Sequence, residues 1–249
     1  MLEAINSGNR QAFARLCASD NFGTRILSAY DYEQNDPASV FLLARNTGGE
    51  PVGALYLRGF SATICGRATE EMRDCLSFLG CQTVFCRERA FPIEKLSLQK
   101  TGFVARLTDT PPKPQQPIQF IDAESLRSIY PCLKWDLPEG DRSPLGSWYV
   151  QLSHRLRHDT CHIAAVCQNG QAVSLALTAA ETEKNAVIGC VRTLPDFQHR
   201  GYGTAVCAAL CQVLSSLGKQ VFLCAEDPLF SFYQPLGFTK IYTWWSGSI

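Results

Sequence analysis

Two glycines at fixed positions give the segment 191–204 the features of an anion-binding loop. The pattern Gln198-x-x-Gly201-x-Gly203 lies between a predicted strand, Ala186 to Arg192, and a predicted helix, Thr204 to Leu217. The first amides of a helix have no partner within it, and the helix macrodipole adds partial positive charge there. Glycine removes the Cβ that would keep a phosphate away from this backbone. The pattern therefore predicts a loop that binds a pyrophosphate.

A second run of residues follows the next predicted strand, Val221 to Cys224. It reads Phe232-Tyr233-Gln234-Pro235-Leu236-Gly237-Phe238. In this order, and after a strand that ends in Thr193-x-Pro195, the two runs resemble the signature of the GNAT superfamily of N-acetyltransferases. That signature combines Gln/Arg-x-x-Gly-x-Gly/Ala with Tyr-x-x-x-Gly-Phe. The resemblance covers residues 118–249.

The resemblance implies an α/β (α+β) protein with the GNAT fold, in which helices flank a central mixed, twisted sheet. It implies that acetyl-CoA is the cosubstrate. The residues that it places at acetyl-CoA are Val191, Arg192, Thr193, Gln198, His199, Arg200, Gly201, Tyr202, Gly203 and Thr204. Backbone amides near Val191 and Thr193 would contact the pantetheine and the thioester carbonyl; the alternative is ordinary hydrogen bonding between strands.

Tyr233 matches the GNAT tyrosine that faces the departing sulfur, so the resemblance makes it the catalytic general acid. The alternative is a core aromatic beside Phe230, Phe232 and Phe238. The general base is not evident, because the stretch Asn185 to Arg192 carries no carboxylate.

Four carboxylates near this strand are weaker candidates for the base. Glu181 and Glu183 lie in the preceding hairpin turn, where we expect them to be solvated. Glu226 and Asp227 end the next strand, but Asp227-Pro228 also reads as a helix N-cap followed by proline at the first helical position. A water relay would leave no trace in the sequence.

One predicted helix, Trp148 to His158, carries two histidines and two arginines. His154 and His158 share a helix face. That spacing suits a metal pair, but no third ligand is evident, so no metal is expected. In GNAT domains this helix borders the acceptor site. A histidine would accept a proton there, and Arg155 and Arg157 would hold an acceptor carboxylate; the alternative is a polar face against solvent.

The remaining elements of the C-terminal part are predicted from local patterns. We expect a strand at Ile118–Ile121, a helix from an Asp122 N-cap to Leu133, and strands at His162–Cys167 and Ala172–Ala180. Asn169-Gly170 between the last two predicts a hairpin.

Four prolines in residues 109–117 predict a linker between two lobes, 1–108 and 118–249. The first lobe repeats parts of the second. Ser77-x-Leu79-Gly80-x-Gln82-x-x-x-Cys86 resembles Ser215-x-Leu217-Gly218-x-Gln220-x-x-x-Cys224, and Val40–Arg45 with Val52–Leu57 predicts a similar hairpin. An unrelated α/β lobe is the alternative.

The differences between the lobes bear on function. Glu70 and Glu71, not a glycine loop, open the helix that follows the predicted strand Ala62–Cys65. Carboxylates in a first helical turn would repel a pyrophosphate. Leu98 stands where the repeat would place Tyr233. If the lobes are related, the first is degenerate.

Composition excludes several classes of protein. With 23 basic and 23 acidic residues in 249, the chain lacks the excess of basic residues that is typical of proteins that bind nucleic acid. No apolar run approaches the ~20 residues that span a bilayer, and the N-terminus has no signal-peptide pattern. The 12 cysteines include no Cys-x-x-Cys pair, so we expect reduced core thiols in a cytoplasmic protein.

The sequence therefore predicts an N-acetyltransferase that moves the acetyl group from acetyl-CoA to a primary amine by direct attack in a ternary complex. The acceptor is an amine-bearing small molecule or a protein amino group; nucleic acid and membrane are not expected partners, and the oligomeric state is open. One alternative is a CoA-binding regulatory or interaction protein with little catalysis. Another is an acyltransferase that uses a longer acyl-CoA.

Overall fold

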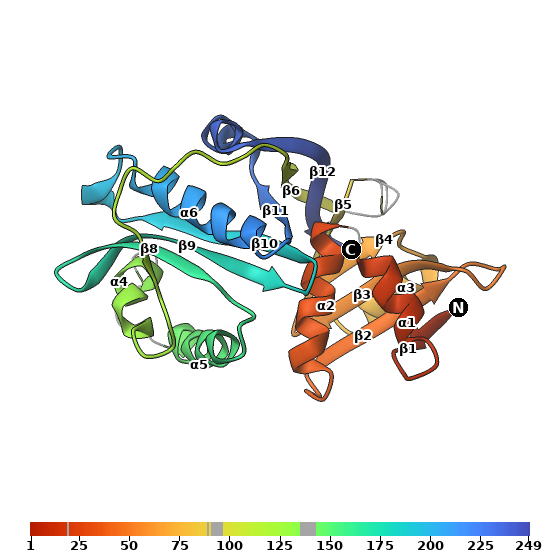
Figure 1. Cartoon of the computed structure of the whole chain (residues 1–249). Helices are drawn as coiled ribbons and strands as arrows, with labels where there is room; N and C mark the ends of the chain where they lie inside the picture. Colours follow the sequence, from red (N-terminus) through yellow and green to blue (C-terminus); the bar gives the residue numbers. More distant parts are fainter. Residues whose placement is uncertain (19, 89, 91–96, 135–142) are drawn as a thin grey trace. The chain divides into compact units, whose positions relative to one another are not determined.

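The computed structural model describes the chain except for residues 19, 89, 91–96 and 135–142 (Figure 1). Its strands are β1 (Leu2–Ala4), β2 (Ser39–Arg45), β3 (Pro51–Arg58), β4 (Ser61–Gly66), β5 (Thr83–Arg87), β6 (Ser97–Leu107), β7 (Gln119–Phe120), β8 (Ile163–Gln168), β9 (Gln171–Glu181), β10 (Asn185–Thr193), β11 (Gln220–Ala225) and β12 (Phe238–Ser248). Its α-helices are α1 (Arg10–Cys17), α2 (Asn21–Glu33), α3 (Glu70–Phe78), α4 (Tyr130–Lys134), α5 (Ser143–Arg157), α6 (Tyr202–Ser216) and α7 (Phe230–Tyr233). Short 3₁₀ turns are η2 (Leu126–Ile129), η3 (Pro195–Phe197), η4 (Asp227–Leu229) and η5 (Gln234–Leu236).

Contacts divide the chain into two compact units. The first unit comprises Met1–Arg106, Phe222–Phe230 and Lys240–Ile249, and the second comprises Leu107–Val221 and Ser231–Thr239. Most of β11 and β12 therefore belongs to the first unit, although both strands come late in the sequence. The domain ranges 1–108 and 118–249 with a linker at 109–117 stay a prediction, because contacts do not show which segments fold independently.

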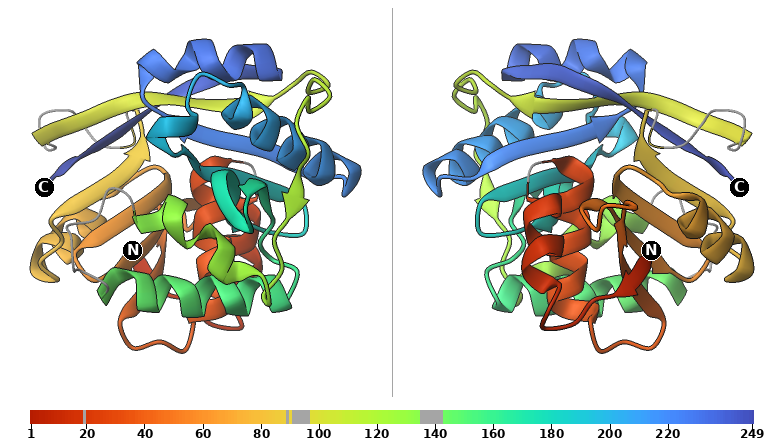
Figure 2. Two further views of the ribbon diagram at one scale, coloured as in Figure 1. Left: turned by 90° about the vertical axis from the view of Figure 1, so that its left-hand side faces the viewer. Right: turned by 90° about the vertical axis from the view of Figure 1, so that its right-hand side faces the viewer.

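The first unit has a sheet with helices on both faces (Figure 2). Its strands follow the order β1-β2-β3-β4-β5-β12-β6-β11, with β4 and β5 parallel. Helices α1 and α2 pack on the face that carries Leu43 and Ala54, whereas α3 packs on the face that carries Ala44 and Leu55. Successive strand residues point to opposite faces, so these neighbours belong to two separate cores.

The expected elements of the first unit are present. The predicted hairpin is formed by β2 and β3, which pair antiparallel. Glu70 and Glu71 occupy the first turn of α3, where the Thr69 side chain accepts a hydrogen bond from the Met72 amide. The Thr69 side chain thus pairs one of the amides at the start of this helix that have no partner within the helix.

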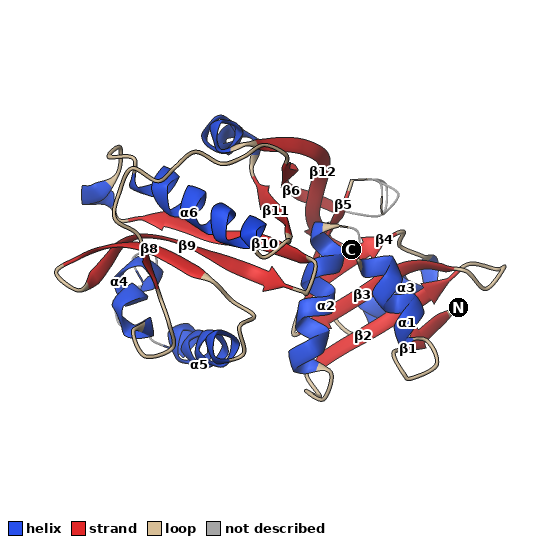
Figure 3. Cartoon of the chain, viewed as in Figure 1, coloured by secondary structure: helices blue, strands red, loops and turns tan. Residues whose placement is uncertain are grey.

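The second unit has four antiparallel strands in the order β10-β9-β8-β7. Helix α6 covers one face, and α4 and α5 lie on the other (Figures 1 and 3). The core beneath α4 and α5 includes Ile129, Cys132 and Leu152 packed with Ile163 and Leu175 of the strands. This arrangement holds the N-terminal end of α6 next to the end of β10.

The predicted β8–β9 hairpin is confirmed in its turn as well as in its strands. Asn169 and Gly170 both have positive φ, 50° and 76°. Two central residues of positive φ define the type I′ turn, whose twist matches that of the strands it joins. Asn and Gly are the residues that adopt this conformation at the least cost.

Two predicted helix starts are wrong in detail. Asp122 does not cap a helix: its Oδ1 accepts hydrogen bonds from the amides of Glu124 and Ser125 in a tight turn, and the helical structure begins later, with η2. Asp227 is the first residue of η4 and not its N-cap, and its carboxylate binds Lys240 at 2.6 Å. In both cases a polar partner close at hand competes with capping.

Candidate functional site

A β-bulge interrupts β10 just before its end. Cys190 and Val191 together face the single residue Ala176 of β9, and Cys190 has a φ of 48°. Such a bulge bends the strand and re-aims the backbone groups next to it. The bend therefore lies at Val191, Arg192 and Thr193, the strand residues that the sequence placed at acetyl-CoA. Sequence reasoning missed the bulge, because Cys190 is not a residue type that signals positive φ.

A buried serine positions the end of β10. Ser174 of β9 is fully buried, and its Oγ lies 2.8 Å from Thr193 Oγ1 and donates to the Arg192 carbonyl at 3.2 Å. Sequence reasoning missed this residue as well. Its only signal is a hydroxyl within the apolar run from Ala172 to Ala180.

The loop between β10 and α6 is held by its own side chains. Gln198 Nε2 donates to the Thr193 carbonyl at 3.3 Å, and Arg200 Nη2 donates to the Asp196 carbonyl at 2.8 Å. His199 adopts a positive φ of 59°. Gln198, His199, Arg200 and Gly201 are all exposed, so the loop presents a preformed backbone to solvent.

Gly201 is the residue on which α6 begins. It lies in the left-handed region with a φ of 76°, and no side chain caps the amides that follow it. A Cβ on Gly201 would meet no atom within 4 Å. The first amides of α6, from Tyr202, Gly203 and Thr204, thus end in an open space that suits an anion.

The second motif packs on the first. A Cβ on Gly203 would lie 3.5 Å from Phe232 Cζ and 3.4 Å from Thr193 Oγ1, which are ordinary contact distances. Tyr233, next to Phe232, packs edge-on against Phe232 and Phe238 and is 8% exposed. The structure thus brings together the two runs that the sequence analysis paired.

The hydroxyl of Tyr233 keeps its proton at neutral pH. Burial raises the pKa of Tyr233 well above its ordinary value, and Cys207 and Cys211 of α6 raise it further. A hydroxyl of this kind is an acid and not a base near pH 7.

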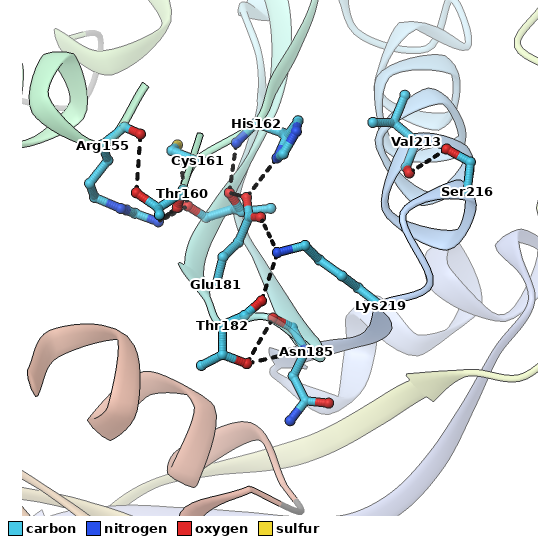
Figure 4. A network of polar contacts seen from close by, with 11 residues as sticks. Arg155, Thr160, Cys161, His162, Glu181, Thr182, Asn185, Val213, Ser216 and Lys219 are labelled. Carbon is cyan, nitrogen blue, oxygen red and sulfur yellow. Dashed lines mark hydrogen bonds and ion pairs between the residues drawn. The ribbon is translucent and has the colours of Figure 1, made fainter. Parts of the chain in front are cut away.

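Glu181 is not solvated, which corrects the expectation for this residue (Figure 4). It is 2% exposed, whereas Glu183 in the same turn is exposed. Its Oε1 lies 2.9 Å from His162 Nδ1 and accepts a hydrogen bond of 2.5 Å from Thr178 Oγ1, and its Oε2 lies 3.0 Å from Lys219 Nζ. The partners come from distant parts of the chain, so the local turn pattern gave no sign of them.

These partners keep Glu181 ionised. Burial by itself raises the pKa of this carboxyl, but hydrogen bonds from His162 and Thr178 and the ammonium of Lys219 outweigh burial and hold the pKa below its ordinary value. A carboxylate that is already engaged by three donors is a poor general base. The structure thus offers no reason to assign the base to Glu181.

Some polar residues at the end of α5 bind the backbone, and others are exposed at the surface. The rings of His154 and His158 lie 4.4 Å apart and both residues are exposed, which confirms that they share a face. Arg155 Nη2 donates to the carbonyls of Thr160 and Thr178, so its guanidinium is engaged by backbone. Within the described residues no group of three or more His, Cys, Asp or Glu side chains is placed to hold a metal ion.

The thiols are free, as the sequence predicted, and most are held protonated. All 12 cysteines are unpaired. Burial raises the pKa of Cys132 and of Cys211 to about 12, and that of Cys224 to about 11. A thiol with such a pKa is a weak nucleophile at neutral pH.

Residues 153–246 match the family model described as FR47-like protein. No curated protein sequence matches the chain significantly. None of the helices in the described part of the chain is long and apolar enough to cross a membrane.

Solved structures match the chain over its whole length. A tandem GNAT protein from the clavulanic acid biosynthesis pathway is 13% identical, with a TM-score of 0.62, over 100% of this chain and 98% of that one. A GCN5-related N-acetyltransferase-like protein from Streptococcus suis is 16% identical, with a TM-score of 0.60, over 98% and 99%. A GNAT-family acetyltransferase from Colwellia psychrerythraea is 10% identical, with a TM-score of 0.61, over 100% of both chains.

At these identities the structural matches establish the fold. They confirm the predicted α+β architecture, a mixed sheet flanked by helices, and the GNAT-like character of the N-terminal part. The chain therefore has the tandem GNAT fold over its whole length, and residues 153–246 in its C-terminal half match the FR47-like model.

Proposed function

We propose that the chain is an acetyl-CoA-dependent N-acetyltransferase. The observation that carries this proposal is the start of α6, where left-handed Gly201 leaves the first helical amides uncapped beside an open space. In this proposal the pyrophosphate of acetyl-CoA lies on those amides. Val191, Arg192 and Thr193 line the pantetheine, and the residues from Gln198 to Thr204 surround the phosphates.

The reaction is a direct transfer within a ternary complex. The nitrogen of a primary amine attacks the thioester carbonyl, the amine loses a proton to water, and the C–S bond breaks as Tyr233 donates a proton to the departing thiolate. The protonated state of Tyr233 supports its role as acid. The raised thiol pKa values favour direct attack over an acyl-cysteine intermediate.

A matched pair of glycine variants tests the phosphate site. Gly201 and Gly218 flank α6, both have positive φ (76° and 72°), and a Cβ on either would meet no atom within 4 Å. Both Gly201→Val and Gly218→Val therefore pay a similar cost in backbone strain. We expect only Gly201→Val to abolish CoA binding in calorimetry. Full-strength binding by Gly201→Val would refute the site.

The absence of a carboxylate from β10 favours a second candidate function. Glu181 of β9 is already engaged by three donors, and β10 itself carries no side chain that would accept the amine proton. This is expected of a CoA-binding regulatory or interaction protein. CoA release from acetyl-CoA over a panel of small amines and lysine peptides separates the two candidates. Binding of CoA without release over that panel would favour the second. The same assay with longer acyl-CoA thioesters measures which acyl chains the site accepts.

A further inference from the structure

Two hydroxyl groups meet between β9 and β10, where β10 ends. Ser174 and Thr193 are paired residues of the two strands, and Ser174 Oγ lies 2.8 Å from Thr193 Oγ1. Ser174 is fully buried, whereas Thr193 is partly exposed. Ser174 Oγ also donates a hydrogen bond of 3.2 Å to the Arg192 carbonyl. The buried hydroxyl therefore has a carbonyl and a second hydroxyl as its neighbours.

The number of protons fixes the direction of these hydrogen bonds. A serine hydroxyl carries a single proton, and a carbonyl oxygen can only accept. Because the proton of Ser174 goes to the Arg192 carbonyl, Ser174 cannot also donate to Thr193. Thr193 is then the donor in the hydroxyl pair. The proton of Thr193 is directed at Ser174, so the rest of Thr193 Oγ1 presents only lone pairs.

These lone pairs lie beside the start of α6. Among the described residues, Ser174 is the only hydrogen-bond partner of Thr193 Oγ1. A Cβ on Gly203 would lie 3.4 Å from this oxygen, and glycine has no side chain to cover it. Gln198 Nε2 donates to the carbonyl of Thr193 and so holds the backbone of the same residue. Thr193 thus offers a fixed acceptor where β10 runs into the loop before α6.

An oxygen that presents only lone pairs attracts an N–H group and repels an anion. The two ends of a CoA molecule differ in this respect. The pantetheine arm contains amide N–H groups, which donate, whereas the ionised phosphates can only accept. A Thr193 side chain that only accepts therefore suits the arm and not the phosphates.

We propose that Thr193 Oγ1 accepts a hydrogen bond from an amide N–H of the pantetheine arm, and that Ser174 is the positioning residue that keeps Thr193 in the accepting orientation. This inference rests on the proposed function, which places Thr193 at the pantetheine. Ser174 itself does not touch the cosubstrate and acts through Thr193.

Calorimetry of the full-length protein with CoA and with 3′-phospho-ADP tests the proposal. The second probe is the phosphate-bearing part of CoA and lacks the pantetheine arm. We expect Thr193→Val to weaken CoA binding by about fivefold, the effect of one lost hydrogen bond. The binding of 3′-phospho-ADP should stay unchanged, which also shows that the variant is folded. Thr193→Ser keeps the hydroxyl and should bind CoA like the wild type.

The chain contains a second hydroxyl pair that provides a matched control. Thr239 Oγ1 lies 2.8 Å from Thr108 Oγ1, and Thr108 Oγ1 donates to the Gly237 carbonyl at 3.3 Å. Thr239→Val therefore removes the same kind of hydroxyl from the same kind of pair, outside the residues proposed to hold acetyl-CoA. It should change the affinity for neither probe.

A double-mutant cycle tests the role of Ser174. Ser174→Ala removes the acceptor of the Thr193 proton and lets the hydroxyl turn, so it should weaken CoA binding by about threefold and leave 3′-phospho-ADP unaffected. In the Thr193→Val background Ser174→Ala should have no further effect on CoA, because residues that act through one group are not additive. Additive effects would overturn the assignment of Ser174 as a positioning residue.

The remaining outcomes separate this inference from the proposed function. Full-strength CoA binding by Thr193→Val, or an equal loss of both probes, would overturn the inference and leave the proposed function intact. A loss of CoA binding in Thr193→Ser as large as that in Thr193→Val would do the same, since packing of the methyl group would then be responsible. Absence of CoA binding to the wild type would overturn the proposed function and the inference with it.

Discussion

Tyr233 follows Phe232, which packs beside the start of α6, and the hydroxyl of Tyr233 keeps its proton. We expect Tyr233→Phe to lower turnover by about 10²-fold, near the low end of the range for general acid catalysis, because a thiolate is a good leaving group. The dissociation constant of acetyl-CoA should stay unchanged, since the ring and its packing are kept. Single-turnover kinetics and calorimetry measure the two effects separately.

Tyr149→Phe provides the control for this variant. Tyr149 is 37% exposed on α5, so loss of its hydroxyl should change neither quantity. If Tyr233→Phe turns over acetyl-CoA at the wild-type rate with chemistry rate-limiting, Tyr233 is a packing residue, and bound water becomes the first candidate for the acid.

Residues whose backbone conformation follows from their own type and their neighbours could be predicted from the sequence. Gly201, Asn169 and Gly170 all have the positive φ that their residue types and neighbours indicated. Glu181 could not be predicted, because its burial depends on His162 and Lys219, which reach it only through the fold.

At the scale of elements, Glu181 connects the end of β9 to His162, the residue before β8, and to Lys219, which follows α6. Because the folded pKa of Glu181 is lowered, its stabilising contribution is complete above the ordinary value of 4.5 and is lost as the pH falls below that value. We expect Glu181→Gln to reduce the free energy of unfolding by about 3 kcal/mol at pH 7, since it leaves Lys219 unpaired. The difference from the wild type should shrink toward pH 4. Urea unfolding at both pH values measures it.

Glu183→Gln is the matched control, because Glu183 lies exposed in the same turn. Its stability should equal that of the wild type at both pH values. If the difference between Glu181→Gln and the wild type is the same at pH 7 and pH 4, the carboxylate of Glu181 is not the group that the network stabilises.

Elements were predictable where local patterns decide them. The strand from Ala186 to Arg192 and the helix from Thr204 to Leu217 correspond to β10 and α6 with shifts of one or two residues. The bulge in β10 was not predictable. It arises from a shift in register between β10 and β9, and no single residue type indicates such a shift. The helix expected after Asp122 is delayed because the Asp122 side chain closes a turn of its own.

At the scale of the whole molecule, two GNAT-like parts begin their corresponding helices differently. Helix α3 has the Thr69 cap and two glutamates in its first turn, whereas α6 has an uncapped glycine start. We therefore expect calorimetry of the full chain to give one CoA per chain, with none left in Gly201→Val. Replacing Glu71 by Ala should not change the stoichiometry. Two sites in the wild type would contradict this.

The fold of the first unit also limits how the chain can be divided. Its sheet includes β12 between β5 and β6, and β11 beside β6, so chain from beyond residue 220 completes it. A fragment of residues 1–108 loses both strands and leaves the backbone groups of β5 and β6 unpaired, at a cost for every buried amide and carbonyl.

We therefore expect the 1–108 fragment to be unfolded and inactive, as judged by near-UV circular dichroism, amide dispersion in NMR spectra and an acetyl-CoA assay. A full-length chain with four extra Gly/Ser residues after Lys113 is the control. Doubling a loop costs only about 0.6 kcal/mol, so this chain should stay folded. A folded 1–108 fragment would show that the first lobe needs neither β11 nor β12, and acetyl transfer by it would contradict the assignment of CoA binding to the C-terminal lobe.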